Sequence, residues 1–296
     1  MSNESASPNR SQRVDIRRIQ AGHDDGAEDQ VAIEEPLEIR VGFEAASGRE
    51  EKAISVTMRT PGNDEELAVG FLFSEGVLAT PDNVVEVWHR SPPVPGDAEL
   101  RNVIRVDLST EADVDFARLE RHFYTTSSCG VCGKTSLEAL RTQSRYTDAI
   151  AESPFQIDAD TILTLTRQFE EQQQVFGQTG GLHASGLFDR SGNIGMVRED
   201  VGRHNAMDKL IGRLFLDGTL PASDVGILVS GRASFELVQK VAMAGVPMIA
   251  AVGAPSSLAV DVARDFGITL IGFLRDGRFN IYSAGERVGA KRTHDE

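Results

Sequence analysis

The chain has 296 residues, of which 40% are hydrophobic and 25% are charged, and this length suffices for one large domain or two small ones with buried cores. Its formal net charge of −15 argues against a general nucleic-acid binder, because such proteins carry a basic surface. The sequence has no apolar run near the roughly 20 residues that span a membrane, and its first residues lack the basic and apolar regions of a signal peptide. We therefore expect a cytoplasmic protein that binds neither nucleic acid nor a membrane.

The first part of the chain changes character near residue 31. Residues 1–30 are polar, and because they can bury little apolar surface they predict a disordered tail. Residues 31–150 alternate apolar and charged side chains and predict a smaller N-terminal α+β lobe, which ends in a cysteine loop and the helix after it. Within this lobe we expect strands at 39–43, 54–58, 84–88 and 103–108 and a helix at 67–73.

The second half, residues 151–284, alternates helices and strands. Asp158 is expected to cap a helix whose apolar residues recur every three or four positions, and a hairpin follows around a polar turn at 189–193. The later strands and helices have the spacing of right-handed parallel crossovers, so we expect an α/β domain followed by a tail over 285–296. The expected elements lie at 158–176, 182–188, 194–197, 202–216, 225–229, 235–244, 247–252, 258–266 and 268–273.

The chain's two cysteines, Cys129 and Cys132, form one C-x-x-C motif flanked by glycine. The thiolate is the reactive form of cysteine, and Lys134 together with a helix expected to begin near Ser136 would lower a thiol pKa. Such a thiol can attack a persulfide and carry its outer sulfur onward. Two alternatives remain open: a zinc site, which would need further ligands, and a dithiol redox site, although no thioredoxin-type strand precedes the motif.

A second candidate segment lies where an expected strand ends and a helix begins. Arg203, His204 and Asn205 follow one another there. Ionisable and amide side chains gathered at a strand end favour a binding or catalytic site. A plain helix start capped by Asp200, with the other side chains solvated, explains the segment equally well.

Two serine-containing loops follow the next expected strands. Ser230 and Arg232 lie in the first loop, and Ser256 lies in the second. Helix N-termini bind anions, and ligands gather at the carboxyl ends of parallel strands, so these loops indicate a phosphate-bearing ligand. The alternative is ordinary helix capping by the serines.

The last candidate segment runs from Phe273 to Arg278. Its arginines and aromatic residues could clamp phosphate and stack on a base. An exposed hairpin turn at Asp276-Gly277 explains the same residues, and without further information the residues favour that exposed turn.

These segments together resemble the FdhD family, the formate dehydrogenase accessory sulfurtransferases. The resemblance covers about residues 35–284 and is carried by Ser128–Lys134, Gly181–Ser185, Arg198–Lys209, Ser230–Ser234, Gly253–Ser257, Phe273–Arg278 and Asn280–Ser283. It implies that Cys129 accepts persulfide sulfur from a cysteine desulfurase, with Cys132 assisting. The sulfur would pass to the molybdenum or tungsten of a bis-(molybdopterin guanine dinucleotide) cofactor, bound as cargo, to mature a formate dehydrogenase apoenzyme.

The same resemblance implies a homodimer without a permanent metal and reverses the preference for an exposed turn. It assigns cofactor binding to Phe273, Leu274, Arg275, Asp276, Gly277 and Arg278. We further expect the cofactor site to include Arg203, His204, Asn205, Ser230, Arg232 and Ser256.

The FdhD family is also similar to cytidine deaminases in its C-terminal domain. We therefore expect a cytidine-deaminase-like three-layer α/β domain beside the N-terminal lobe. The deaminase zinc signature, His-x-Glu followed by Pro-Cys-x-x-Cys, is replaced here by Arg203-His204-Asn205 and Ser230-Gly231-Arg232, so we expect no zinc site. The alternatives to sulfur transfer are a guanine-nucleotide-cofactor-binding chaperone without sulfur chemistry and a zinc-dependent hydrolase or deaminase.

Overall fold

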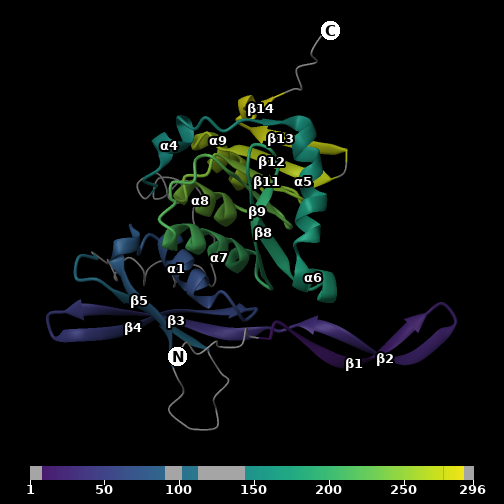
Figure 1. Cartoon of the computed structure of the whole chain (residues 1–296), viewed down its shortest axis with the longest axis horizontal. Coiled ribbons are helices and arrows are strands. Elements are labelled where there is room, and N and C mark those ends of the chain that lie inside the picture. Colours follow the sequence, from purple (N-terminus) through teal and green to yellow (C-terminus); the bar gives the residue numbers. More distant parts are fainter. Residues whose placement is uncertain (1–8, 91–101, 113–143, 276, 290–296) are drawn as a thin grey trace.

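The computed structural model describes residues 9–90, 102–112, 144–275 and 277–289. The chain has a mixed α/β fold in which a larger and a smaller sheet are joined through helices (Figure 1). Among the helices of the described ranges, none has the length and apolar character needed to cross a membrane.

The larger sheet has six strands. They are β8 (His183–Phe188), β9 (Ile194–Asp200), β10 (Gly226–Val229), β11 (Met248–Ala251), β12 (Thr269–Arg275) and β13 (Arg278–Ser283). Their order is β13-β12-β11-β10-β8-β9. Strands β10, β11 and β12 are parallel, and β8 runs antiparallel to both β10 and β9. Strand β9 therefore points in the same direction as the three parallel strands.

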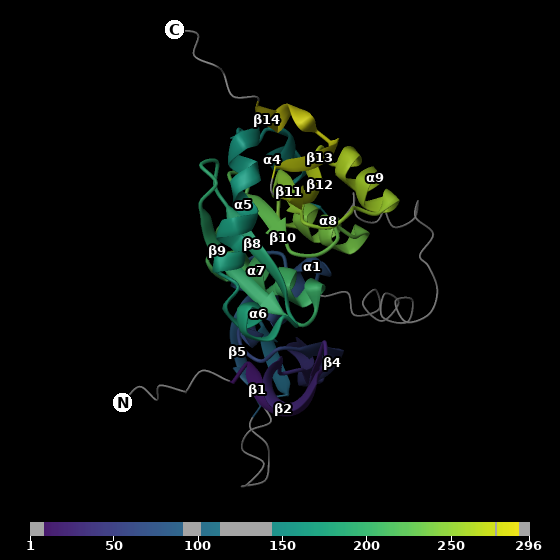
Figure 2. The same cartoon turned by 90° about the vertical axis from the view of Figure 1, so that its right-hand side faces the viewer.

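Helices cover both faces of the larger sheet and make three layers (Figure 2). On one face lies α5 (Ala159–Glu171), whose Ile162, Leu165 and Phe169 are buried against the strands. The other face is covered by α7 (Arg203–Leu216), α8 (Phe235–Met243) and α9 (Ser257–Asp265). The side chains buried under α5 are those whose helical spacing predicts the helix, so burial of this apolar stripe explains why the segment is helical.

The helix expected at 158–176 is broken into α5 and a second helix, α6 (Gln174–Thr179). Asp158 is the N-cap residue of α5, but its side chain makes no capping hydrogen bond. The break has a tertiary cause, because the Glu199 carboxylate accepts hydrogen bonds from the backbone N–H groups of Val175 (3.2 Å) and Phe176 (2.8 Å). A carboxylate at this position satisfies the free donors of a new helix start.

The smaller sheet has the order β4-β3-β6-β5 and forms the N-terminal lobe with α1. Its elements are β3 (Glu35–Ala45), β4 (Gly48–Arg59), α1 (Asp64–Ser74), a 3-10 turn (Pro81–Asn83), β5 (Val84–His89) and β6 (Val103–Leu108). Alternate residues of β3, Leu37, Ile39 and Val41, are buried in the same hydrophobic cluster as α1 and α7. Helix α1 therefore joins the two lobes through one continuous core.

Helices α1 and α7 cross at two facing glycines. A Cβ atom added to Gly70 would lie 1.9 Å from the carbonyl oxygen of Asp208, and one added to Gly212 would lie 1.8 Å from that of Glu66. Both distances are far below van der Waals contact, so the two backbones touch. Only glycine permits this approach at either position.

A hairpin of β1 (Ser11–Gln20) and β2 (His23–Ala32) replaces the disordered tail predicted for residues 1–30, so that prediction is wrong over residues 11–30. The hairpin extends sideways from the N-terminal lobe (Figure 1), with pairing in continuous register. Arg17 and Asp24 form an ion pair across the strands, and Arg10 donates to the carbonyl oxygen of Glu199 at 2.9 Å at the base. Cross-strand pairing and this anchor stabilise a segment whose composition indicates disorder.

The predicted C-terminal tail over 285–296 is also wrong for its first residues. A 3-10 turn (Gly285–Arg287) leads into β14 (Val288–Gly289), which pairs with β7 (Ile157–Asp158). The Arg287 guanidinium is buried and donates to the carbonyl oxygens of Gly267 and Ile150, both at 2.7 Å. The latter residue belongs to the short helix α4 (Thr147–Ala151), so Arg287 attaches this end of the chain to the helical layer.

Candidate functional site

The loops that carry the predicted site residues meet at one edge of the larger sheet. Because β9, β10, β11 and β12 point in the same direction, their carboxyl ends all lie at this edge. The first residue of β8 and the first residue of β13 lie there too, since both strands run in the opposite direction. The predicted sheet-edge arrangement is thus confirmed, and the carboxyl edge is the usual ligand site in sheets of this kind.

Backbone hydrogen bonds hold three of these loops side by side. The N–H of Gly253 donates to the carbonyl oxygen of Gly231 at 2.9 Å, and the N–H of Phe273 donates to that of Gly253 at 3.0 Å. A Cβ atom on Gly253 would lie 2.9 Å from the Gly231 oxygen and 3.0 Å from Arg232 Cα. The loops are therefore packed backbone to backbone, which leaves the side chains of their neighbours to form the surface of the edge.

The two predicted serines make structural hydrogen bonds. Ser230 Oγ accepts from the backbone N–H of Ala184 at 2.9 Å, which ties the end of β10 to β8. Ser256 Oγ accepts from the N–H of Ala259 at 3.3 Å and caps α9. The capping alternative therefore accounts for the position of Ser256, and Ser230 serves to link two strands.

The segment from Phe273 to Arg278 forms the tip of the β12–β13 hairpin, and Asp276 lies outside the described residues. Leu274 is buried in the core, whereas Arg275 and Arg278, like Arg232 in the neighbouring loop, are exposed. Phe273 has a φ of 55°, a conformation that costs a non-glycine residue energy and is concentrated at functional sites.

Two histidines face this edge in a neutral form. Burial, helped by the charges of Arg203 and Lys240, lowers the pKa of His204 to about 4. Burial also lowers the pKa of His183, again with a contribution from Arg203. His204 Nε2 lies 3.4 Å from Ser234 Oγ and 3.8 Å from Glu236. The first turn of α7 and the start of β8 thus each place an uncharged imidazole near Arg203.

The Nε atom of Arg203 is buried and has no hydrogen-bond partner among the described residues. The N-cap of α7 is Gly202, whose N–H donates to Asp200 Oδ1 at 2.8 Å, and the Asn205 side chain lies beside it. A buried guanidinium nitrogen that lacks a partner among the described residues is suited to an anionic group. This arrangement supports the predicted role of Arg203.

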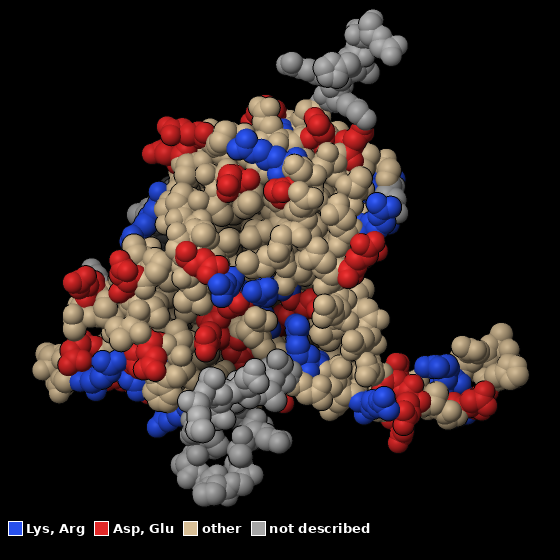
Figure 3. All heavy atoms as spheres, viewed as in Figure 1, with Lys and Arg blue, Asp and Glu red and all other residues tan. Residues whose placement is uncertain are grey.

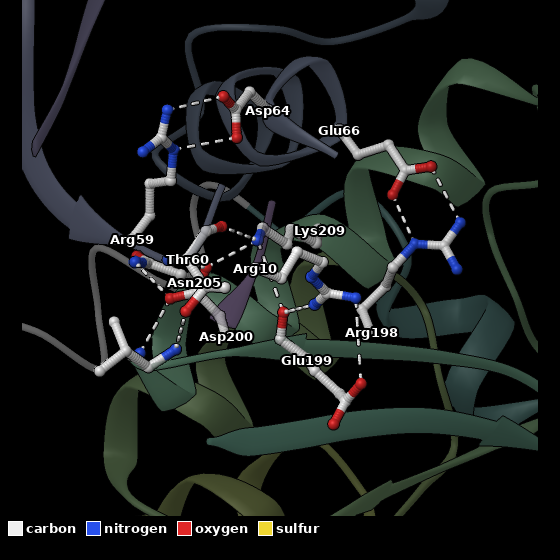
Figure 4. A network of polar contacts seen from close by, with 12 residues as sticks. Arg10, Arg59, Thr60, Asp64, Glu66, Arg198, Glu199, Asp200, Asn205 and Lys209 are labelled. Carbon is white, nitrogen blue, oxygen red and sulfur yellow. Dashed lines mark hydrogen bonds and ion pairs between the residues drawn. The ribbon is translucent and has the colours of Figure 1, made fainter. Parts of the chain in front are cut away.

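Asn205 and Asp200 belong instead to a polar network between the lobes (Figure 4). Asn205 Nδ2 donates to the carbonyl oxygen of Met58 at 2.7 Å and to Asp200 Oδ1 at 3.0 Å. Asp200 is fully buried and lies 2.7 Å from Lys209 Nζ, which also donates to the carbonyl oxygen of Thr60 at 2.8 Å. The interpretation of Asp200 as a helix cap is therefore wrong: its carboxylate pairs with a buried lysine.

Charged side chains of both signs gather where the lobes meet on one face of the molecule (Figure 3). Arg198 forms a bidentate pair with Glu66 of α1, with nitrogen–oxygen distances of 2.5 and 2.9 Å. Arg59 pairs in the same way with Asp64, at 3.1 and 3.0 Å. Bidentate geometry fixes orientation as well as distance, so these pairs hold α1 against both lobes.

Two residues near the edge, His183 and Glu236, are missing from the predicted site. His183 is the first residue of β8, and its antiparallel pairing with β10 brings it to the carboxyl edge. Glu236 lies in the first turn of α8. The antiparallel hairpin expected at 182–197 contained the signal for His183, because its first strand must begin where β9 ends.

Cys129 and Cys132 lie outside the described residues. Within the ranges that the structure covers, no group of three or more His, Cys, Asp and Glu side chains is placed to hold a metal ion.

Comparison with known proteins gives concordant results. The family model described as FdhD/NarQ matches residues 32–289. The sulfur carrier protein FdhD of Streptomyces avermitilis is 44% identical over 281 residues, which is 95% of this chain and 96% of that protein. The proteins of the same name from Mycolicibacterium paratuberculosis and Sulfurisphaera tokodaii are 46% and 44% identical, with 93% of this chain covered in each case and 97% and 98% of theirs.

A solved structure from Desulfotalea psychrophila, named as a candidate formate dehydrogenase accessory protein, has the same fold. Its TM-score is 0.68 at 24% identity, and the match covers 95% of this chain and all of the other. At this identity the likeness speaks for the fold alone. The family-model match and the relatives above 40% identity establish that the chain belongs to the FdhD/NarQ family.

Proposed function

We propose that the protein is a sulfurtransferase for formate dehydrogenase maturation, in which Cys129 carries sulfur from a cysteine desulfurase to a molybdenum or tungsten bis-(molybdopterin guanine dinucleotide) cofactor. The observation that carries this proposal is the C-x-x-C motif, which holds both cysteines of the chain, in a protein whose family relatives are named sulfur carriers. A formate dehydrogenase apoenzyme is the proposed client, and the cytoplasm and a homodimer are the proposed setting.

The first step, transfer of sulfur from the donor to Cys129, needs no oxidant. The Cys129 thiolate attacks the outer sulfur of the donor's persulfide, the donor's S–S bond breaks, and the donor thiolate leaves. Cys129 then holds the sulfur as a persulfide. For delivery, the Cys132 thiolate attacks Cys129 Sγ and expels hydrosulfide toward the metal. The resulting Cys129–Cys132 disulfide is reduced by a cellular dithiol before the next cycle.

The sheet edge supports binding of an anionic cargo. Arg232, Arg275 and Arg278 are exposed there, and Arg203, whose buried Nε has no hydrogen-bond partner among the described residues, adds a further cationic group. The cargo carries phosphates in both nucleotide arms, which arginine binds in bidentate fashion. We assign the phosphates to this edge and the neighbouring Phe273–Arg278 hairpin tip.

The cytidine-deaminase-like scaffold forms part of the proposal. It is supported by the three-layer arrangement and by a sheet in which the first strand, β8, runs antiparallel to strands β9–β12. A deaminase with this fold would hold zinc at the start of α7 and in the loop after β10. This chain has Arg203-His204-Asn205 at the first place and Ser230-Gly231-Arg232 at the second. In this proposal the same edge binds nucleotide without the metal.

The test is direct transfer of sulfur to the full chain. The protein is incubated with a cysteine desulfurase and cysteine, and its intact and peptide masses are measured without reductant. We expect a gain of one sulfur atom on the peptide that contains Cys129, retention of that gain in Cys132→Ala and its loss in Cys129→Ala. If both thiols are free, the desulfurase is active and no gain occurs, sulfur transfer is wrong and a cofactor chaperone without sulfur chemistry takes its place.

A further inference from the structure

A pocket of about 260 Å³ lies between the lobes, where β3, β4, α1, α7 and α8 meet. Its apolar wall includes Ile39, Leu67 and Phe71, and its ionisable wall includes Glu75 and Glu236. Sites for drug-sized ligands usually have about 300 to 1,000 Å³, so this pocket has room for a single ring system. The phosphates and the second nucleotide arm of a dinucleotide would have to lie outside it.

The pocket carries uncompensated negative charge. Its one lysine, Lys240, lies 2.6 Å from Asp208 Oδ1 and is neutralised there. His204 also lines the pocket, but its pKa of about 4 leaves it uncharged near neutral pH. The charges of Glu75 and Glu236 therefore remain, although Arg203, which is outside the lining, acts on Glu236.

Glu75 is in an unfavourable position for an acidic side chain. It is the C-cap residue of α1, and the last turn of that helix has no basic residue. The C-terminus of a helix carries partial negative charge, so a carboxylate there is repelled. In the described part of the chain, the Glu75 carboxylate has no hydrogen bond or ion pair, which makes it available to a ligand that brings positive charge or N–H donors.

Glu236 is fixed on the opposite side by its own helix. Burial alone would raise its pKa, but hydrogen bonds from its own backbone N–H and from Ser234, with the charge of Arg203, lower it. The side chain is therefore ionised near neutral pH and held at the N-terminus of α8. With two carboxylates, one neutral imidazole and an apolar wall, the pocket is suited to a planar ligand that donates hydrogen bonds.

We propose that this pocket binds the amidine-type edge of a small planar molecule, that is, a carbon flanked by two nitrogens that both donate N–H groups. Such an edge pairs with a carboxylate through two parallel hydrogen bonds. A delocalised N–C–N group is less strongly hydrated than an ammonium ion, so it loses less on entering a pocket with an apolar wall. The flat body of the ligand would lie against Ile39, Leu67 and Phe71, and the carboxylates would keep phosphate out.

The proposed cargo displays this edge on two kinds of ring, since guanine and pterin share a 2-amino-4-oxopyrimidine. In this respect the inference rests on the proposed function and makes it more specific. His204 lines the pocket and also contacts Ser234 in the loop after β10. A ring in the pocket would therefore leave its attached phosphate near the arginines of the sheet edge.

Calorimetric titration of the full chain with guanosine, pterin and adenosine tests the pocket. We expect guanosine or pterin to bind and adenosine, which lacks the paired donors, to bind at least about tenfold more weakly, as loss of a hydrogen bond to a charged group predicts. If guanosine binds and pterin does not, the pocket takes the guanine end of the cargo. If pterin binds and guanosine does not, the pocket takes the pterin end. Equal affinity for adenosine overturns the proposal.

Charge-neutral variants test the two carboxylates. Of Glu75→Gln and Glu236→Gln, the one that removes the carboxylate paired with the edge should weaken binding of the preferred ring by about tenfold. Glu171→Gln, which changes an exposed glutamate on α5, should leave the affinity unchanged. Unliganded Glu75→Gln should melt at or above the temperature of the original chain, because the substitution removes a charge that the helix end repels. Unchanged affinity in both pocket variants would refute the assignment.

Two further measurements separate this inference from the proposed function. Arg275→Ala/Arg278→Ala should weaken binding of guanosine diphosphate while leaving the affinity for the unphosphorylated ring unchanged. Sulfur uptake is measured on the unsubstituted chain. If Cys129 takes up sulfur but no ring binds in the pocket, the pocket proposal is wrong and the proposed function stands. If a ring binds but no sulfur is taken up, the proposed sulfur chemistry is wrong and the pocket proposal stands.

Discussion

His204 shows how one residue can be identified from the sequence while its chemistry depends on the fold. Its position at a strand-to-helix junction is visible in the sequence, and the structure confirms that it lies in the first turn of α7 at the sheet edge. Its uncharged state is not visible there. That state results from burial, from Arg203 and Lys240, and from His183, against the opposing charge of Glu236.

The neutral state of His204 predicts a dependence of stability on pH. The unfolded chain binds a proton on this imidazole below about pH 6.5, but the folded chain does so only near 4. The unfolded state therefore holds more protons between these values, so the free energy of unfolding falls as the pH is lowered from about 6.5 toward 4. Urea denaturation at several pH values should show a shallower fall in His204→Gln.

The exposed His23 on the hairpin provides the matched control, and His23→Gln should keep the slope of the original chain. An imidazole signal of His204 that titrates near 6.5 in NMR spectra would contradict the assigned neutral state.

Polar residues mark the limit of prediction at this scale. Arg203 and His204 are found at the expected edge, whereas Asn205, one position later, turns toward Met58 and Asp200. Adjacent positions on a helix differ in direction by about 100°, so one residue of a motif can face the sheet edge while the next contacts the other lobe. The packing of α7 against α1 determines which residue takes which position.

Among the elements, α1 and α7 are the pair whose contact depends most directly on sequence. Their crossing at Gly70 and Gly212 brings the two backbones into contact. A glycine in a helix normally lowers the stability of that helix by about 1 kcal/mol relative to alanine. Here the missing side chain is what allows the two helices to approach. The sequence predicts both helices from their apolar residues, but the glycines acquire a reason only when the helices are seen to cross.

Gly70→Ala should therefore destabilise the protein by about 1 to 3 kcal/mol, despite the better helix propensity of alanine, because the new methyl group has no space. The control is Gly177→Ala in α6, where an added Cβ meets nothing within 4 Å; it should be neutral or stabilise by up to about 1 kcal/mol. Urea denaturation measures both, and a stable Gly70→Ala would show that the helices can separate without loss.

Periodicity predicts the elements between 39 and 273 well, and composition predicts the N-terminus poorly. The expected strands and helices are present where the structure describes them, with the helix expected at 158–176 divided in two, because each has an apolar stripe that must be buried. The β1–β2 hairpin has little such surface. It depends on pairing between its strands and on the Arg10 contact with Glu199, and neither can be read from the composition of one segment.

In the whole molecule, a buried ion pair lies where the lobes meet. Lys209 and Asp200 are both fully buried and lie 2.7 Å apart, and Lys209 also holds the carbonyl oxygen of Thr60. Thr60 belongs to the connection between β4 and α1. The pair therefore links the two halves of the chain at the level of backbone and charge.

Lys209→Met should lower the free energy of unfolding by about 3 to 5 kcal/mol, because it leaves the Asp200 carboxylate buried without its cation. Arg213→Met removes an exposed partner of Asp217 from the same helix and should cost less than about 1 kcal/mol. The double change Asp200→Asn/Lys209→Met should recover part of the loss. Equal effects of Lys209→Met and Arg213→Met in urea denaturation would mean that the buried pair contributes nothing special.

The single hydrophobic cluster that runs from Leu37 through α1 and α7 to Leu270 has a consequence for how such proteins can diversify. A lobe with its own closed core can be exchanged between relatives as a module. Here α1 is encoded in the first half of the chain but completes the interior of the second. A recombinant that takes its halves from two relatives would join mismatched surfaces along α1, so the two halves must change together over generations.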